Sequence, residues 1–274
     1  MLQSLSTAVS GLQQFQEDID VIGNNIANVN TTGFKSGSVN FEDAFSQAIG
    51  AGSPSNQVGT GVTTGAIQNN FSPGTVSATG VGSDLAIPGQ GFFVVKDPAD
   101  SAQYLTRDGT FHLDANDYLV TNGSQRVQGY SDGGLTTIGD LKIDATGAPA
   151  TATPGATVSS WSVDTSGKIT VTLSDNTSFV RGQVLLQNYG NPGALVKEGA
   201  NLYSATSSAG PLAQPAAPGT NGVSAIQSGY LEMSNVDLTS EMANMITAER
   251  AFQANARVIT TSDEILQEIA GLKR

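Results

Sequence analysis

The single histidine, His112, is the residue of this sequence that most resembles a catalytic group. It lies in the segment TFHLD, between Asp108 and Asp114, where a carboxylate could orient it as a general base. The sequence has no Gly-x-Ser-x-Gly elbow to supply a nucleophile beside such a base. Because TFHLD alternates like a strand, an exposed strand position explains His112 better than a catalytic site. We therefore expect no catalytic residues and no enzyme.

Two other segments resemble ligand sites. Residues 114–119, DANDYL, look like part of a calcium loop but lack the Gly at the sixth position and the Glu at the twelfth. The run GQGFF at 89–93 is rich in glycine, yet no helical pattern follows it to bind a phosphate. The chain contains no Cys, which excludes thiolate zinc clusters, thiol catalysis and disulfides. We predict a hairpin turn and a strand entry at these positions, with no cofactor and no metal.

Composition narrows the class of protein further. The 274 residues include 32 Gly, only 13% are charged, and the formal net charge is −12. Such an acidic chain has no basic stripe for nucleic acid and is repelled by anionic lipid surfaces. Residues 1–34 contain no Lys or Arg, and no run of about 18 apolar residues occurs anywhere. We expect no nucleic-acid partner, no membrane insertion and no cleaved signal peptide.

The strongest periodic signal lies at the two ends of the chain. Apolar residues recur there at heptad spacing, which is typical of helices that pack on other helices. The pattern predicts a helix from about Leu5 to about Ala27 and a second one that starts near Asp237–Thr239. Each helix has only the other as an internal partner, so their outer faces are predicted to contact neighbouring subunits. The predicted assembly seam consists of Leu5, Ala8, Leu12, Phe15, Ile19, Ile22, Ile26, Val29, Met242, Met245, Phe252, Ala256, Ile259 and Leu266.

The middle of the chain reads as β structure. Short alternating runs are separated by Gly, Asn and Asp clusters between residues 85 and 188, a pattern typical of hairpins. We predict an α+β fold in which long paired terminal helices, as a coiled coil, are joined by a Gly-rich connector to a mainly antiparallel β domain. The expected domains are 1–33 with 236–274 as the helical part, 34–79 as an extended connector, and 80–235 as the β-rich part, with a small insertion at about 141–182.

Several motifs resemble one family. The segment DVIGNNIAN at 20–28, followed by TTGFK at 31–35, resembles the start of the bacterial flagellar rod and hook proteins. Residues 228–267, from SGYLEMSNVDLTSEM to the end of DEILQ, resemble the closing helix of that family. The central runs DLAIPGQGFFVV, YLTRDGTFHLDANDYLVTNGSQRVQGY and GALVKEGANLYSAT are also similar. The resemblance covers nearly the whole chain in the same order.

The resemblance implies a structural subunit that polymerises with itself. The terminal helices would line a hollow tube as an inner domain, and the β region would form the outer domain. The other partners implied are the adjoining rod and hook–filament junction proteins and the flagellar export apparatus. Export would place the chain in the flagellum, outside the cell, without a cleaved signal peptide. Phe41 and Phe45 have the form of the family's export element, although Phe15 and Ile19 have the same form.

Within the family, the sequence favours a hook subunit. GFKSGSVNFED, NNFSPGTVSATGVGSDLAI and QRVQGY look more like hook proteins. The hook is a flexible joint that connects rod to filament and transmits torque. The length fits a distal rod subunit better, because 141–182 leaves room for only a small insertion, and we keep that subunit as the alternative. An alternative from another class is an extracellular glycan-binding β domain on a coiled-coil stalk.

Overall fold

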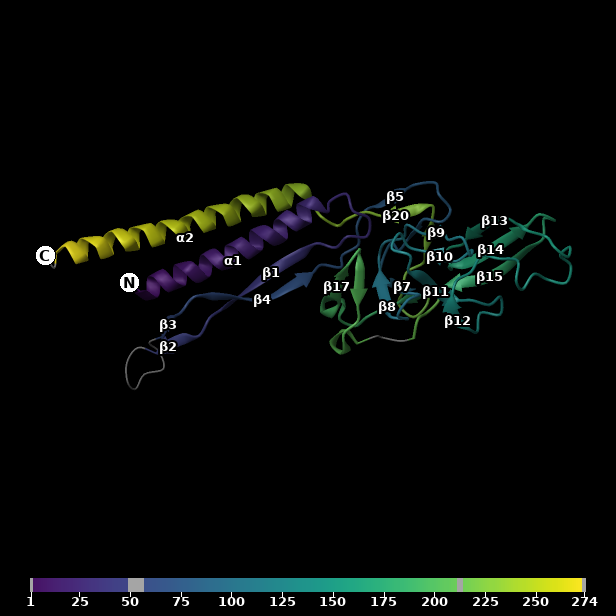
Figure 1. The fold of residues 1–274 in the computed structure, drawn as a ribbon, viewed down its shortest axis with the longest axis horizontal. Helices are drawn as coiled ribbons and strands as arrows, with labels where there is room; N and C mark the ends of the chain where they lie inside the picture. Colours follow the sequence, from purple (N-terminus) through teal and green to yellow (C-terminus); the bar gives the residue numbers. More distant parts are fainter. Residues whose placement is uncertain (1, 49–56, 211–213, 273–274) are drawn as a thin grey trace. The chain divides into compact units, whose positions relative to one another are not determined.

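The computed structural model describes residues 2–48, 57–210 and 214–272 (Figure 1). Residues 49–56 of the expected connector and 273–274 of the expected C-terminal helix lie outside this description. The chain forms two units. Unit 1 contains Met1–Val29, Ser36–Asn70 and Val236–Arg274, and unit 2 contains Asn30–Lys35 and Phe71–Asn235. A helix at each end and a mainly antiparallel β region between them confirm the predicted α+β class.

Unit 1 contains the two long helices, α1 (Leu2–Ala27) and α2 (Leu238–Leu272), which run antiparallel and side by side (Figure 1). Asp237 sets the start of α2. Its carboxylate accepts hydrogen bonds from the Thr239 backbone nitrogen at 3.0 Å and from the Ser240 hydroxyl at 2.8 Å. Such side-chain capping satisfies backbone donors that have no partner in the first turn. The predicted start of this helix is confirmed.

A two-stranded antiparallel ribbon completes unit 1. Its strands are β1 (Gly37–Asp43) and β4 (Val62–Asn69), and β2 (Ser46–Ala48) pairs with β3 (Gln57–Gly59). The Phe41 ring packs edge-on against Phe15 of α1, with ring centroids 5.9 Å apart. Residues 37–43 and 62–69, which belong to the predicted extended connector, therefore form a paired ribbon on a helix. Strand pairing satisfies the backbone groups of this polar segment.

Unit 2 is built on a sheet whose main path runs β13-β14-β15-β11-β7-β8-β18-β17, with antiparallel pairing throughout. One core packs Phe93, Val127 and Ile169, and a second packs Phe92 and Tyr203. The elements of unit 2 are β5 (Val76–Ala78), β6 (Leu85–Ala86), β7 (Phe92–Lys96), β8 (Gln103–Thr106), β9 (His112–Leu113), β10 (Leu119–Val120), β11 (Arg126–Tyr130), β12 (Ile138–Asp140), β13 (Val158–Val163), β14 (Lys168–Leu173), β15 (Ser178–Val184), β16 (Leu186–Gln187), β17 (Val196–Gly199), β18 (Leu202–Ser204), β19 (Gln227–Ser228) and β20 (Tyr230–Glu232), with the short helices η1 (Pro192–Ala194) and η2 (Ser207–Ala209).

The predicted hairpins of this region are present. In DANDYL, the Asp114 carboxylate accepts hydrogen bonds from the backbone nitrogens of Asn116 at 2.7 Å and Tyr118 at 2.9 Å. This Asx turn connects β9 to β10, which pair with each other. Those backbone hydrogen bonds lower the pKa of Asp114. The predicted hairpin turn at this position is confirmed.

Candidate functional site

The structure places His112 on β9, opposite Val120, with an exposed side chain. The Asp108 carboxylate accepts hydrogen bonds from the Thr32 hydroxyl at 3.0 Å and from the Thr110 hydroxyl at 3.0 Å. This carboxylate is therefore engaged by hydroxyl groups in a structural turn. The geometry gives His112 the exposed strand position that its sequence pattern predicts.

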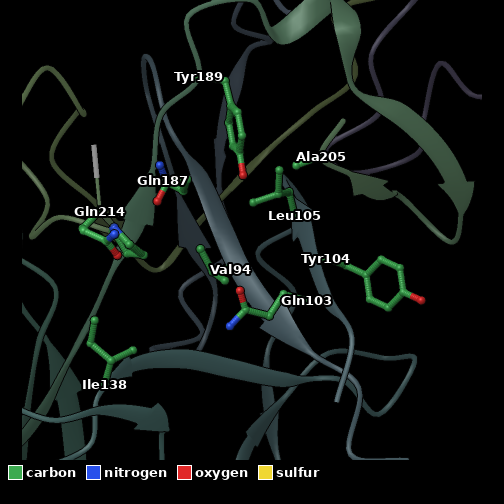
Figure 2. Close-up of a pocket in the computed structure, with 10 residues that line it drawn as sticks. Val94, Gln103, Tyr104, Leu105, Ile138, Gln187, Tyr189, Ala205 and Gln214 are labelled. Carbon is green, nitrogen blue, oxygen red and sulfur yellow. The ribbon is translucent and has the colours of Figure 1, made fainter. Parts of the chain in front are cut away.

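A pocket of about 330 Å³ lies in unit 2 (Figure 2). Figure 2 shows the ring of Tyr104 pointing away from the other labelled side chains. The lining carries amide, phenol and aliphatic groups without a charged side chain, so it lacks an acid–base pair. His112 is not among the residues that line it. The lining residues are Val94, Gln103, Tyr104, Leu105, Ile138, Gln187, Tyr189, Ala205, Gln214 and Pro215.

One face of α1 holds the ribbon through polar contacts. The Asn25 side chain donates to the Gly37 carbonyl at 2.8 Å and accepts from the Gly37 backbone nitrogen at 2.9 Å. The Thr64 hydroxyl of β4 donates to Gln14 and Glu17. Gln14, Glu17 and Asn25 lie three and eight positions apart, which at 3.6 residues per turn places them on one side of the helix. The ribbon thus covers the polar side of α1 and, through Phe41, also contacts Phe15 of the predicted seam.

A second face of α1 packs on α2 through small residues. The buried positions are Ala8, Gly11 and Ile22 on α1 and Ala248 and Ser262 on α2. A β-carbon at Gly11 would lie 3.1 Å from the amide nitrogen of Asn255, so the two helices approach closely there. Ala248, Asn255 and Ser262 repeat every seven residues, next to the larger apolar row of the predicted seam. The helix contact therefore uses the small and polar row.

The larger seam residues lie beside this contact and are incompletely covered. Ala8 and Ile22 are buried and Leu266 is 37% exposed, while Met242, at 50% exposed, lies farther around α2 on the side away from α1. Apolar rows of this kind on two neighbouring helices form a surface that further helices could cover. That these residues are an assembly seam stays a prediction. The half-buried members are Leu5, Leu12, Phe15, Ile19, Ile26, Val29, Met245, Phe252, Ala256 and Ile259.

The two residues of the possible export element differ in exposure. Phe41 lies on β1, is 40% exposed and contacts Phe15. Phe45 lies between β1 and β2 and is 95% exposed. An aromatic side chain this exposed contributes little to the stability of unit 1, so it is available to a partner. Its use in export stays a prediction.

A buried charge cluster in unit 2 was not predicted. Lys35 Nζ lies 2.6 Å from Glu232 Oε1, and Arg107 Nη1 lies 3.3 Å from Glu232 Oε2. Burial lowers the pKa of Lys35 and of Arg107. The neighbouring Glu232 carboxylate raises both pKa values but does not outweigh burial. The Arg107 guanidinium also lies over the Phe92 ring, 4.9 Å from its centroid. The Glu232 carboxylate is therefore paired with two buried cations, Lys35 and Arg107.

This cluster ties together the segments of unit 2 through which the chain enters and leaves. Lys35 Nζ donates to the Ser72 carbonyl at 2.9 Å, and the Gly74 backbone nitrogen donates to Glu232 Oε1 at 3.0 Å. The Asn235 amide donates to the Ser72 hydroxyl at 3.0 Å. We call residues 30–35, 71–75 and 232–235 the crossing cluster. The sequence did not predict this cluster, because no local pattern distinguishes a charged residue that will be buried from one that stays exposed.

Models of three flagellar domains match the chain. They are described as "Flagella basal body rod protein" over residues 5–35, "Flagellar hook protein FlgE/F/G D1 domain" over 86–171, and "Flagellar basal body rod FlgEFG protein C-terminal" over 227–272. The first and third cover most of α1 and of α2, and the second lies within the sheet of unit 2. These matches and the fold define the class as a structural subunit of the flagellar axial assembly.

Full-length relatives support the same assignment. The chain is 40% identical over 283 residues to the flagellar basal-body rod protein FlgG of Bacillus subtilis, with 100% of both chains covered. It is 35% identical over 288 residues to the FlgG of Borreliella burgdorferi, again with 100% of both covered. The flagellar hook protein FlgE of Borreliella burgdorferi is 26% identical over 445 residues, with 100% of both covered. The chain belongs to the bacterial flagellar rod and hook protein family.

Membership of the flagellar rod and hook family tests several of the predictions made from the sequence. The family is structural, which confirms that the chain is not an enzyme, and it places the chain among self-assembling proteins of the flagellum. Relatives of both the rod and the hook match, so the choice of a hook subunit is not resolved by them. Among the described residues, no helix is long and apolar enough to cross a membrane.

Proposed function

We propose that this chain is a rod subunit of the flagellar basal body, and within the rod its distal part. Relatives named as rod proteins support this choice, at 40% and 36% identity over nearly the whole of both chains. The hook relative supports it less, because its 26% identity is spread over an alignment of 445 residues, far longer than this chain of 274 residues. The hook remains the second candidate, on the strength of the three segments that resemble hook proteins.

The observation that carries self-assembly is the incompletely covered apolar surface of α1 and α2. Close packing through Gly11, Ala248 and Ser262 leaves larger neighbours such as Phe252 and Ile259 only half-buried. In a tube of many copies, those side chains would pack against the helices of adjacent subunits and be withdrawn from water. The terminal helices would then form the inner layer of the polymer as a coiled coil.

The remaining parts take roles around that inner layer. We assign 1–33 and 236–274 to the inner layer, 34–79 to the connection and 80–235 to the outer β domain. The chain would reach its place through the flagellar export apparatus, with Phe41 and Phe45 as the export element, and would then contact the adjoining rod and hook–filament junction proteins. The net charge of −12 supports a route and a location away from nucleic acid and anionic membranes.

Electron microscopy of basal bodies from a strain that lacks this gene tests the proposal. We expect a truncated rod that never reaches the outer ring, and full length should return when the intact chain is supplied. A complete rod that lacks only its hook would make the chain the hook subunit instead. Intact flagella and normal motility would refute both candidates.

Truncation tests the role of the helices. Chains that lack residues 1–30 or 238–274 should be made at normal levels but should not restore motility to the same strain. Deleting residues 149–155, an exposed or half-buried loop of unit 2, serves as the matched control because it leaves α1 and α2 intact. Motility restored by either helix truncation would contradict assembly through the helices.

A further inference from the structure

One side of α2 points directly away from α1 and carries an unusual combination of residues. We call Met242, Ile246, Arg250, Gln253 and Arg257 the outer stripe; they recur at steps of three and four and so share one face. At 3.6 residues per turn, this face lies opposite the row that packs on α1. Met242 is 50% exposed and Ile246 is 52% exposed, and both arginines are exposed. The outer stripe therefore has an apolar end and a basic end.

The charges of unit 1 are distributed unevenly. Arg250 and Arg257 are the only basic residues in its described part, and neither forms an ion pair with a described residue. They lie seven positions apart, or roughly 10 Å along the helix. Glu249 flanks the outer stripe on α2 itself. The charged residues of α1 and of the described ribbon are all acidic: Glu17, Asp18, Asp20, Glu42 and Asp43.

The ribbon presents two of those acids to solvent. Because Phe41 of β1 turns toward Phe15 of α1, the next side chain, Glu42, points to the opposite side of the ribbon. A β-carbon at Gly65 would lie only 2.6 Å from the carboxyl carbon of Glu42. The absence of a side chain at Gly65 therefore leaves room for the Glu42 carboxylate. Asp43 is exposed beside it, and Phe45 follows with 95% of its side chain exposed. This end of the ribbon is thus acidic and apolar.

We propose that the outer stripe of one copy docks on the acidic end of the ribbon of a second copy. Arg250 and Arg257 pair with Glu42 and Asp43, and the exposed Phe45 covers the apolar end of the stripe. This rests on the proposed self-assembly and adds to it a specific pair of surfaces. Charge complementarity favours the ribbon of a second copy as the partner of the outer stripe. Acidic ribbons packed together in a polymer without nearby cations would repel one another.

Charge reversal in a strain that lacks the native gene tests the pairing. R250E/R257E alone and E42R/D43R alone should each reduce the number of complete rods, and motility, at least about tenfold. Cells that express both variants together should recover, because an acidic stripe then meets a basic ribbon and a basic stripe meets an acidic ribbon. Failure of the mixture, or full assembly of either variant alone, would overturn the docking.

The variant D20R is the matched control. Asp20 is exposed on α1, outside both surfaces, and the substitution changes charge in the same sense as E42R/D43R. We expect D20R to assemble normally. If it fails as severely as the ribbon variant, overall charge and not surface pairing controls assembly, and the proposal is wrong. Circular dichroism of each purified variant, with an unchanged spectrum expected, separates docking from misfolding.

Because the native chain has no Cys, engineered thiols give a direct readout of proximity. One copy with R250C and a differently tagged copy with D43C should form a disulfide-linked heterodimer in assembled basal bodies. The pair Gln13→Cys with D43C should not, since Gln13 lies on the exposed side of α1. A deletion strain with intact rods would refute the proposed function itself. A deletion strain without rods, rescued by chains that never cross-link at 250 and 43, would refute only the docking.

Discussion

Lys35 Nζ lies 2.6 Å from Glu232 Oε1, and both side chains are fully buried although the residues are 197 positions apart in the chain. Arg107 approaches the other carboxylate oxygen at 3.3 Å. Removing charges from water is costly, and only close pairing with additional hydrogen bonds offsets that cost. Glu232 receives such bonds from its two cations and from the Gly74 backbone nitrogen. It therefore holds the crossing cluster together.

We predict an unequal response when this cluster is broken. Glu232→Gln leaves two buried cations without an anion and should destabilise unit 2 by about 3–5 kcal/mol. Lys35→Met leaves Glu232 paired with Arg107 and should cost less, about 1–3 kcal/mol. Urea denaturation followed by the fluorescence of Trp161, which lies in unit 2, measures both. Lys96→Met, at the half-buried end of β7, is the control and should stay within about 0.5 kcal/mol of the native chain. Equal losses for the two cluster variants would contradict the central role of Glu232.

The two glycines of α1 should respond oppositely to larger residues. A β-carbon at Gly23 would meet nothing within 4 Å, so Gly23→Ala should stabilise α1 by about 1 kcal/mol. At Gly11 the same atom would lie 3.1 Å from Asn255, and Gly11→Val should push the helices apart at a cost of about 1–3 kcal/mol. Helicity at 222 nm during thermal unfolding measures the difference. Stabilisation by Gly11→Val would mean that α1 and α2 do not pack closely there.

Acid should weaken unit 2 through Asp144. Partial burial raises the pKa of this carboxyl, but hydrogen bonds from Arg181 and Thr146 outweigh burial and lower the pKa from 3.8 to about 2. A carboxyl with a depressed folded pKa contributes stability above its unfolded value, and that stability is lost as pH falls from about 4 to about 2. Unfolding curves of the native chain and Asp144→Asn should therefore differ at pH 7 and converge near pH 2.

The pairing with Arg181 supplies the internal control for that measurement. Arg181 Nε lies 2.8 Å from Asp144 Oδ1. Arg181→Gln combined with Asp144→Asn should cost less than the two single changes added together at pH 7, and the coupling should vanish near pH 2. A coupling that is independent of pH would show that the carboxylate charge is not responsible.

Both terminal helices should exchange their amide hydrogens quickly in the isolated monomer. The α1–α2 contact rests on small residues, and at the end of α2 Ile269 is 50% exposed and Leu272 86% exposed. Few buried apolar contacts mean a low free energy of local opening. Hydrogen exchange should be slow in β7 and β11, whose core side chains are buried, and fast in α1 and α2. Slow exchange along both helices of a verified monomer would contradict the prediction.

The elements that depend on local patterns could be predicted from the amino-acid sequence. The end of α1 at Ala27, the start of α2 after Asp237 and the short strands between residues 85 and 188 were predicted, because heptad spacing, turn residues and alternation are properties of neighbouring positions. Family membership was also readable, since the motifs DVIGNNIAN and SNVDLTSEM are continuous in the chain. The paired ribbon left a weaker signal, because Val62, Ala66 and Ile67 hinted only at short strands within a polar, Gly-rich segment.

Which side chains contact one another could be read only from the folded structure. The heptads of α2 contain a row of large apolar residues and a row of smaller residues. The close approach of the helices at Gly11 places the smaller row, Ala248, Asn255 and Ser262, against α1. No local pattern distinguishes Lys35, Arg107 and Glu232 from exposed charges, yet the fold brings them together across 197 positions. Burial depends on how the whole chain folds, and pairing between residues far apart in the chain depends on topology. Neither can therefore be predicted from the spacing of neighbouring residues.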